Sequence, residues 1–128
     1  MDFLSSNSFL MLEKSLGYLW TKQAAIADNI ANAETPEYKE KVVTFEDSLK
    51  SKLLLASRRS APVKSMRRVL ESTPFSVTEQ MVQTRMDDNG VNVTAQAAEA
   101  VRNAYQMRYV ISSINSDLAI LNSAIRGQ

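Results

Sequence analysis

The side chains that perform most enzymatic chemistry are scarce in this sequence of 128 residues. It contains neither Cys nor His, which excludes thiolate nucleophiles, histidine general bases, disulfides and almost all structural zinc sites. The adjacent carboxylates of Asp87 and Asp88 could exchange protons, but they precede the turn sequence Asn89-Gly90. No phosphate-binding glycine loop accompanies them. We therefore expect a protein that is not an enzyme, with no cofactor, no metal and no small-molecule substrate.

Basic side chains are concentrated in the middle of the chain. Residues 50–70 contain 7 Lys and Arg residues and no acid, whereas residues 1–49 contain 4 basic and 8 acidic residues. Such clusters can bind the phosphates of nucleic acids or anionic membranes. The segment has no aromatic side chain on which a base could stack, so we expect a solvated loop and no nucleic-acid binding. Contact with an anionic membrane, a membrane ring or peptidoglycan is the alternative. The basic residues are Lys50, Lys52, Arg58, Arg59, Lys64, Arg67 and Arg68.

The N-terminal third has the spacing of an amphipathic helix. Apolar residues recur at alternating steps of three and four, the a/d pattern of a coiled coil, with one interruption at Gln23. Ser6, Asn7 and Ser8 offer N-caps, and Pro36 ends the pattern. The spacing predicts a helix over residues 7–33. The N-terminal heptad stripe is Phe9, Leu12, Leu16, Leu19, Ile26 and Ile30.

The C-terminal third repeats this pattern without a break, which predicts a second helix over residues 92–126. A helix of this extent is on the order of 50 Å long, and a compact chain of this size has a radius of gyration of only about 14 Å. The expected shape is therefore a rod. The C-terminal heptad stripe is Val93, Ala97, Ala100, Ala104, Met107, Ile111, Ile114, Leu118, Leu121 and Ile125.

The stretch between the helices, residues 34–89, has no sustained period. We expect a short strand near residues 42–45, at most a helical turn within 46–55, a mobile loop over 56–72, and a strand or hairpin within 73–89. The predicted fold is a single all-α subunit spanning residues 1–128. In it, the two terminal helices form an elongated antiparallel coiled coil and the middle is irregular and partly extended.

Two helices alone would leave much apolar surface in water. Bundles usually close with three or four helices, and apolar side chains also occur outside both stripes. Large, rigid aromatic side chains such as these often anchor contacts between proteins. We therefore expect a subunit of an assembly. The additional apolar residues are Leu10, Met11, Tyr18, Trp20, Tyr105, Tyr109, Val110 and Ile120.

The junction after the first helix carries a specific motif. The run from Asn29 to Tyr38 resembles the signature of bacterial flagellar axial proteins, N-I-A-N-A-x-T-P-G-Y, with Glu37 at the position of the usual Gly. The short length resembles the rod members of this family, and so does the C-terminal helix. The signature residues are Asn29, Ile30, Ala31, Asn32, Ala33, Thr35, Pro36 and Tyr38.

This resemblance implies a structural subunit of the proximal rod of the flagellar basal body. Its implied partners are copies of itself, other rod proteins, proteins at the junction between rod and membrane ring, and the flagellar type III export apparatus. Export of this kind uses no cleaved signal peptide, and the first residues here lack the basic segment of a secretory signal. Phe45 and Leu49 match the short apolar pattern by which such substrates engage the export gate. The two residues could equally be ordinary packing residues.

Overall fold

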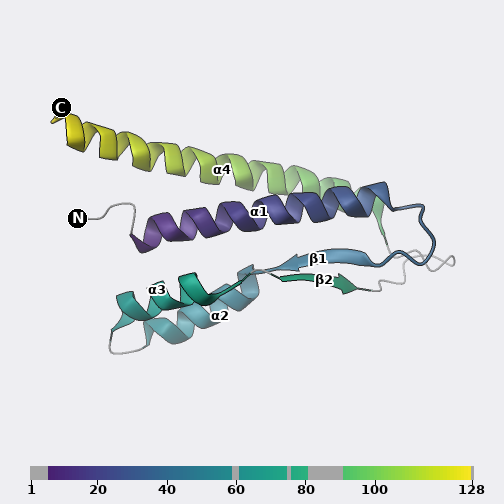
Figure 1. Ribbon diagram of the computed structural model, residues 1–128. Helices are drawn as coiled ribbons and strands as arrows, with labels where there is room; N and C mark the ends of the chain where they lie inside the picture. The colour runs from purple at the N-terminus through teal and green to yellow at the C-terminus, as the bar shows by residue number, and fades with distance from the viewer. Residues whose placement is uncertain (1–5, 59–60, 75, 81–90, 128) are drawn as a thin grey trace.

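The computed structural model describes residues 6–58, 61–74, 76–80 and 91–127. Within these ranges the chain forms four helices and one small sheet (Figure 1). Asp87 and Asp88 lie outside the described residues, as does much of the hairpin expected within 73–89. The prediction of an all-α subunit is confirmed in part, since the described chain is mostly helical but also forms a small two-stranded sheet. The elements are α1 (Asn7–Ala31), β1 (Glu40–Thr44), α2 (Glu46–Ser57), α3 (Pro62–Ser72), β2 (Ser76–Gln80) and α4 (Val93–Arg126).

The two long helices α1 and α4 lie side by side and run in opposite directions (Figure 1). A cross-helix hydrogen bond joins Asn29 of α1 to Gln96 near the start of α4. Another joins Gln23, one and a half turns earlier in α1, to Asn103 further along α4. Because residue numbers rise in one helix as they fall in the other, the pair is antiparallel. The C-terminal end of α4 extends beyond the start of α1 (Figure 1).

Local sequence explains where both helices begin. The Ser6 hydroxyl accepts a hydrogen bond from the Phe9 amide at 3.1 Å, and the Asn92 side chain accepts one from the Ala95 amide at 3.1 Å. These contacts pair backbone N–H groups that the first turn of a helix leaves free. At the other end of α4, Gly127 has a φ of 69°, a left-handed conformation that glycine adopts without steric cost.

The middle of the chain is more regular than its sequence indicates. The expected strand is present as β1, which pairs with β2 in antiparallel register so that Val43 lies opposite Val77. The expectation of a mobile loop over residues 56–72 is wrong, because α3 occupies most of that range and packs against α2 and α1. Its charged residues obscured a short amphipathic pattern in which Leu70 is buried and Met66 and Val69 are half-buried.

The core lies where the α1–α4 pair meets β1 and the two helices α2 and α3. The buried cluster draws side chains from α1, β1, α2, α3 and α4, and the rings of Tyr18 and Phe45 lie 5.3 Å apart at its centre. The middle region therefore packs on one side of the α1–α4 pair. The buried residues of the cluster are Tyr18, Leu19, Ala25, Val43, Phe45, Leu49, Leu70 and Val110.

Candidate assembly site

The most completely bonded residue of the signature is Asn29 in the last turn of α1. Its side chain is 1% exposed and bonds to both backbone groups of Lys41: Nδ2 donates to the carbonyl at 2.9 Å, and Oδ1 accepts from the amide at 2.8 Å. Nδ2 also donates to Gln96 Oε1 of α4 at 3.2 Å. One amide side chain therefore connects α1, β1 and α4, which we call the Asn29 clamp.

Two further polar residues complete the Asn29 clamp. The Tyr38 hydroxyl donates a hydrogen bond to Asn29 Oδ1 at 3.3 Å, and Gln96 Nε2 donates one to the Glu40 carboxylate. Burial raises the pKa of Glu40, while the Gln96 hydrogen bond acts in the opposite direction. Burial also raises the pKa of the Tyr38 hydroxyl. Through Gln96, the Glu40 carboxylate is thus linked to the hydrogen bonds of Asn29 at the junction of α1, β1 and α4.

The turn that follows α1 depends on the rest of the signature. Asn32 caps the helix by donating its side-chain Nδ2 to the Asp28 carbonyl at 2.8 Å, and the Thr35 hydroxyl donates to Asn32 Oδ1 at 3.2 Å. Glu37 has a φ of 59°. The turn therefore keeps the left-handed conformation that suits the family's glycine, although Glu37 carries a side chain that disfavours it.

An ion pair holds the start of β1 to the end of α1 on the outside of this turn. Lys41 Nζ lies 2.8 Å from Asp28 Oδ2. The hydrogen bond and the negative charge of Asp28 raise the pKa of Lys41. Sequence analysis missed Lys41, Glu40 and Gln96, since nothing in their local spacing marks them as partners of Asn29.

The two heptad stripes differ in how completely a single chain covers them. In the N-terminal stripe, Leu19 and Ile26 are buried, Phe9, Leu12 and Leu16 are half-buried, and Ile30 is exposed. In the C-terminal stripe, Met107, Ile114 and Leu121 are half-buried, and Ile111, Leu118 and Ile125 are exposed.

The side of α4 that faces α1 is centred on other residues: Gln96, Asn103 and Val110, each one residue before a member of the predicted stripe. Asn103 is fully buried and donates Nδ2 to the Leu19 carbonyl at 3.0 Å and to Gln23 Oε1 at 2.8 Å. A search for apolar spacing overlooks this row because two of its three members are polar. Their seven-residue spacing was the available signal.

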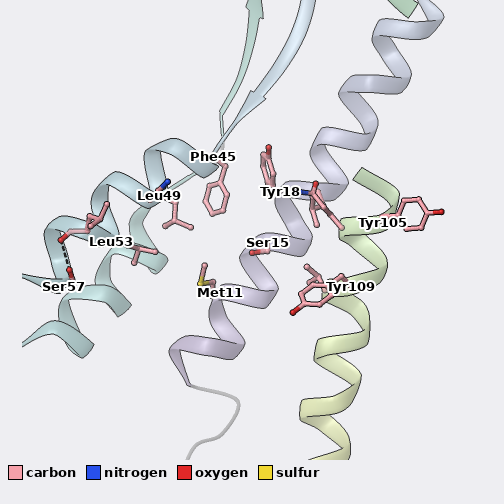
Figure 2. Close-up of a pocket in the computed structure, with 14 residues that line it drawn as sticks. Met11, Ser15, Tyr18, Phe45, Leu49, Leu53, Ser57, Tyr105 and Tyr109 are labelled. Carbon is pink, nitrogen blue, oxygen red and sulfur yellow. Dashed lines mark hydrogen bonds between the residues drawn. The ribbon is translucent and has the colours of Figure 1, made fainter. Parts of the chain in front are cut away.

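An open apolar groove of about 930 Å³ lies between α2 on one side and α1 and α4 on the other (Figure 2). Phe45, Leu49 and Leu53 face Met11 and Tyr18 across it, and Tyr109 stands at its rim (Figure 2). Gln106 also lines the groove, and its buried Oε1 has no hydrogen-bond partner among the described residues. The groove can accept an apolar segment.

The outer face of α4 presents a second apolar surface. Tyr105 and Tyr109 are 67% and 74% exposed, and Ile120 and Ile125, in the last two turns of α4, are 62% and 74% exposed. Large exposed apolar side chains concentrated on one helix are typical of protein contacts. No described segment of the chain covers them. We refer to Val101, Tyr105, Tyr109 and Ile120, whose spacing places them on one side of the helix, as the outer face of α4.

Phe45 and Leu49, the pair that matches an export pattern, lie in the core. Their side chains are 3% and 5% exposed, and both belong to the cluster around Tyr18. The folded subunit therefore conceals them, and only an unfolded chain presents them to another protein.

Neither a metal site nor a membrane span emerges from the described part of the chain. Its carboxylates do not gather in groups of three or more that could hold a metal ion. None of its helices is long and apolar enough to cross a bilayer.

Comparison with known proteins agrees with the signature. No family model matches the chain. A flagellar basal body rod protein FlgB from Bacillus subtilis is 27% identical over 128 residues, covering 97% of each chain. Over nearly its whole length, this chain resembles FlgB. A second FlgB, from Proteus mirabilis, is 24% identical over 132 residues, covering 94% of each chain.

The resemblance to FlgB includes the middle of the chain, for which the sequence alone suggested no relative. The aligned range of nearly the full chain takes in α2 and α3 as well as the two long helices. Both relatives carry the name FlgB, which favours this rod protein over FlgC, the rod protein of similar size that shares the N-terminal signature.

Proposed function

We propose that the chain is a structural subunit of the proximal rod of a bacterial flagellar basal body. The observation that carries this proposal is the outer face of α4, a row of large apolar side chains that the subunit leaves uncovered. The resemblance to FlgB over nearly the full chain supplies the kind of assembly to which such a face belongs. A structural role, without catalysis or a bound cofactor, agrees with both.

Further copies of the chain and other rod proteins are the proposed partners of this face. In the assembled rod, α1 and α4 would act as an elongated antiparallel coiled coil whose exposed rows pack against neighbouring subunits around the export channel. Heterologous contacts of this kind generate open helical assemblies when the rotation between subunits does not close. Such an assembly would transmit torque towards the hook through interlocked helices.

The two apolar surfaces of the subunit adjoin at Tyr105 and Tyr109, which also line the groove. The groove beside α2 is concave and the free end of α4 protrudes, so one subunit offers both a receiving and an inserting surface. A neighbour that occupies the groove would bury the rim residue Tyr109.

Delivery by the flagellar type III export apparatus is the second part of the proposal. The chain lacks Cys, and the described residues form no metal cluster, so no covalent or metal cross-link of these kinds opposes unfolding before export. Phe45 and Leu49 would engage the export gate while the chain is unfolded and join the core after it folds. The subunit would then lie in the rod of the basal body, next to the proteins that join the rod to the membrane ring.

Purification of intact hook–basal bodies from the source cells tests the proposal. We expect mass spectrometry to find this chain in the particles, and to find it still after the hook and filament are removed. A strain without the chain should form no rod, and the wild-type chain should restore it. Normal basal bodies in that strain, with the chain found only in the soluble fraction, would contradict a rod function.

A further inference from the structure

Positive charge is concentrated on the helical hairpin of α2 and α3, after the two acidic residues that begin α2. The six described Lys and Arg side chains of the hairpin are all exposed. Arg67 pairs with Glu71 at 2.9 Å, but the other five form no ion pair with a described residue. These five are Lys50, Lys52, Arg58, Lys64 and Arg68. The FlgB resemblance assigns no role to this charge.

A cleft of about 260 Å³ lies between the two helices, and two of these basic residues line it. Lys52 comes from α2 and Arg68 from α3, and the hydroxyl-bearing residues Ser65 and Ser72 line the same cleft. A guanidinium binds two phosphate oxygens at once, and hydroxyls and an ammonium add further donors. The chemistry of this lining fits a phosphate group carried on a larger molecule.

Two more cations flank the cleft. Arg58 follows the cleft residue Leu55 by three positions in α2 and its cap, and Lys64 precedes Arg68 by four positions in α3. Residues at these spacings are neighbours on a helix surface. The face around the cleft therefore presents four cations, which is more than a single phosphate requires. An extended anionic surface suits this arrangement better than a small anion.

An apolar side chain distinguishes among the extended anionic partners. Leu55 lines the cleft and is 65% exposed, beside Val69 and the buried Ala56. Basic helices with exposed leucine lie in the headgroup region of membranes, where the cations contact lipid phosphates and the apolar side chain reaches the acyl boundary. The hairpin has no aromatic residue for stacking on nucleic-acid bases.

We propose that the α2–α3 hairpin binds the surface of membranes that contain anionic phospholipids. A headgroup phosphate occupies the cleft between Lys52 and Arg68, and Leu55 enters the interface beside it. This binding is separate from rod assembly. It uses a basic surface, whereas the outer face of α4 is apolar. It requires only the folded single chain.

Co-sedimentation of the full-length chain with vesicles tests the proposal. We expect binding to an equal mixture of phosphatidylcholine and phosphatidylglycerol, and none to phosphatidylcholine alone. The double variant Lys52→Glu/Arg68→Glu should bind the mixed vesicles at least about tenfold more weakly, because two attractive charges near the surface become repulsive. Leu55→Ser should weaken the binding that persists at raised salt, since salt screens the charges but not apolar contact.

The matched control is Lys39→Glu/Arg108→Glu, which makes the same change of net charge at two exposed positions outside the hairpin. It should bind as the wild-type chain does, and circular dichroism should show that both double variants keep their helices. Absence of binding to the mixed vesicles at low salt would overturn the proposal, as would an equal loss in the control variant. Displacement from the vesicles by inorganic phosphate or by soluble polyglutamate at equal charge would instead assign the cleft to a free or polymeric anion.

Discussion

Asn29 and Lys41 are joined as if they were neighbours in a sheet, although Asn29 belongs to a helix. The Asn29 amide donates to the Lys41 carbonyl at 2.9 Å and accepts from the Lys41 amide at 2.8 Å, so one side chain satisfies both backbone groups of a strand residue. A buried backbone group without a partner costs about 1–3 kcal/mol. The Asn29 clamp therefore fixes the direction in which the chain leaves α1.

The variant Asn29→Asp tests this relationship with little change in shape. It replaces the donor Nδ2 by an oxygen, so the Lys41 carbonyl and Gln96 Oε1 both lose their donor, and it places a charge at a position that is 1% exposed. We expect the free energy of unfolding to fall by about 2–4 kcal/mol. Urea denaturation followed by circular dichroism measures it.

The control for this substitution is Asn92→Asp at the N-cap of α4. The chemical change is identical, but Asn92 is exposed and its oxygen accepts the hydrogen bond from Ala95, a role that aspartate performs equally well. Its free energy of unfolding should change by less than about 0.5 kcal/mol. Equal midpoints for the two variants would mean that the Asn29 clamp does not stabilise the fold.

Glu37 should respond to substitution in a direction unusual for an exposed residue. Its φ of 59° costs a non-glycine residue about 1–2 kcal/mol. Glycine avoids this cost, but its greater conformational freedom stabilises the unfolded chain by about 0.5–1 kcal/mol. We therefore expect Glu37→Gly to raise the free energy of unfolding by about 0.5 kcal/mol. Glu37→Val should lower it, because a branched side chain tolerates positive φ least.

Glu34→Gly serves as the comparison, since Glu34 is also exposed in this turn but has no positive φ. Only the entropy term applies there, so thermal unfolding should occur at a lower temperature than in the wild-type chain. A lower unfolding temperature for Glu37→Gly as well would show that the turn does not strain Glu37.

The half-buried carboxyl of Glu40 predicts a pH dependence of stability. Its pKa in the folded chain is raised above the ordinary value of 4.5 by burial. The folded state therefore binds the proton more tightly than the unfolded state, and this contribution is complete below pH 4.5 and lost as the pH rises through the folded pKa. Over that window the Glu40 contribution to the free energy of unfolding should decrease with rising pH.

Glu40→Gln should remove this part of the pH dependence, because the amide keeps an oxygen that can accept from Gln96 but does not ionise. At neutral pH the variant should unfold at a higher urea concentration than the wild-type chain. Glu34→Gln changes the net charge equally at an exposed position and provides the reference profile. Parallel stability profiles of Glu40→Gln and the wild-type chain between pH 4 and 7 would refute the assignment.

The outer face of α4 predicts variants that fold but do not assemble. Val101→Asp or Tyr109→Asp places a charge where a neighbouring subunit would bury it, whereas in the isolated chain both positions are exposed. We expect unchanged circular dichroism, loss of the chain from basal bodies and loss of swimming. Ser8→Asp adds the same charge at an exposed polar position in the first turn of α1 and should assemble. Normal swimming of both apolar-site variants would contradict a role of this face in assembly.

The sequence predicts the long helices more readily than the contacts between them. Steps of three and four, with Ser6 and Asn92 as caps, are local signals and suffice for α1 and α4. The facing row of α4 depends on Gln96 and Asn103, whose value comes from partners more than sixty positions away in the chain. No local pattern contains that information, so apolar spacing found Met107 and Ile114, which pack against the core, but not the buried polar residues beside them.

The same limit applies to the middle of the chain and to the signature. The pattern of α3 is short, and its cations made residues 56–72 resemble a loop. Only the structure shows that Leu70 packs in the core. The signature identified Asn29, but its partner Lys41 belongs to a strand whose position depends on the turn at Glu37. Long-range polar partners were thus the part of the site that sequence could not supply.

Leu49 should affect export separately from its effect on stability. It is 5% exposed in the core, so Leu49→Ala is expected to lower the free energy of unfolding by about 2–5 kcal/mol. If the unfolded chain presents Phe45 and Leu49 to the export gate, the same variant should also reach the culture medium or periplasm in smaller amounts.

Leu70→Ala is the matched variant, since Leu70 is 3% exposed in the same cluster but lies outside the pattern. It should lose comparable stability and be exported normally, because export requires an unfolded chain and a less stable fold does not hinder it. Immunoblotting of secreted and retained fractions compares the two, and equal export of both variants would assign Leu49 to packing alone.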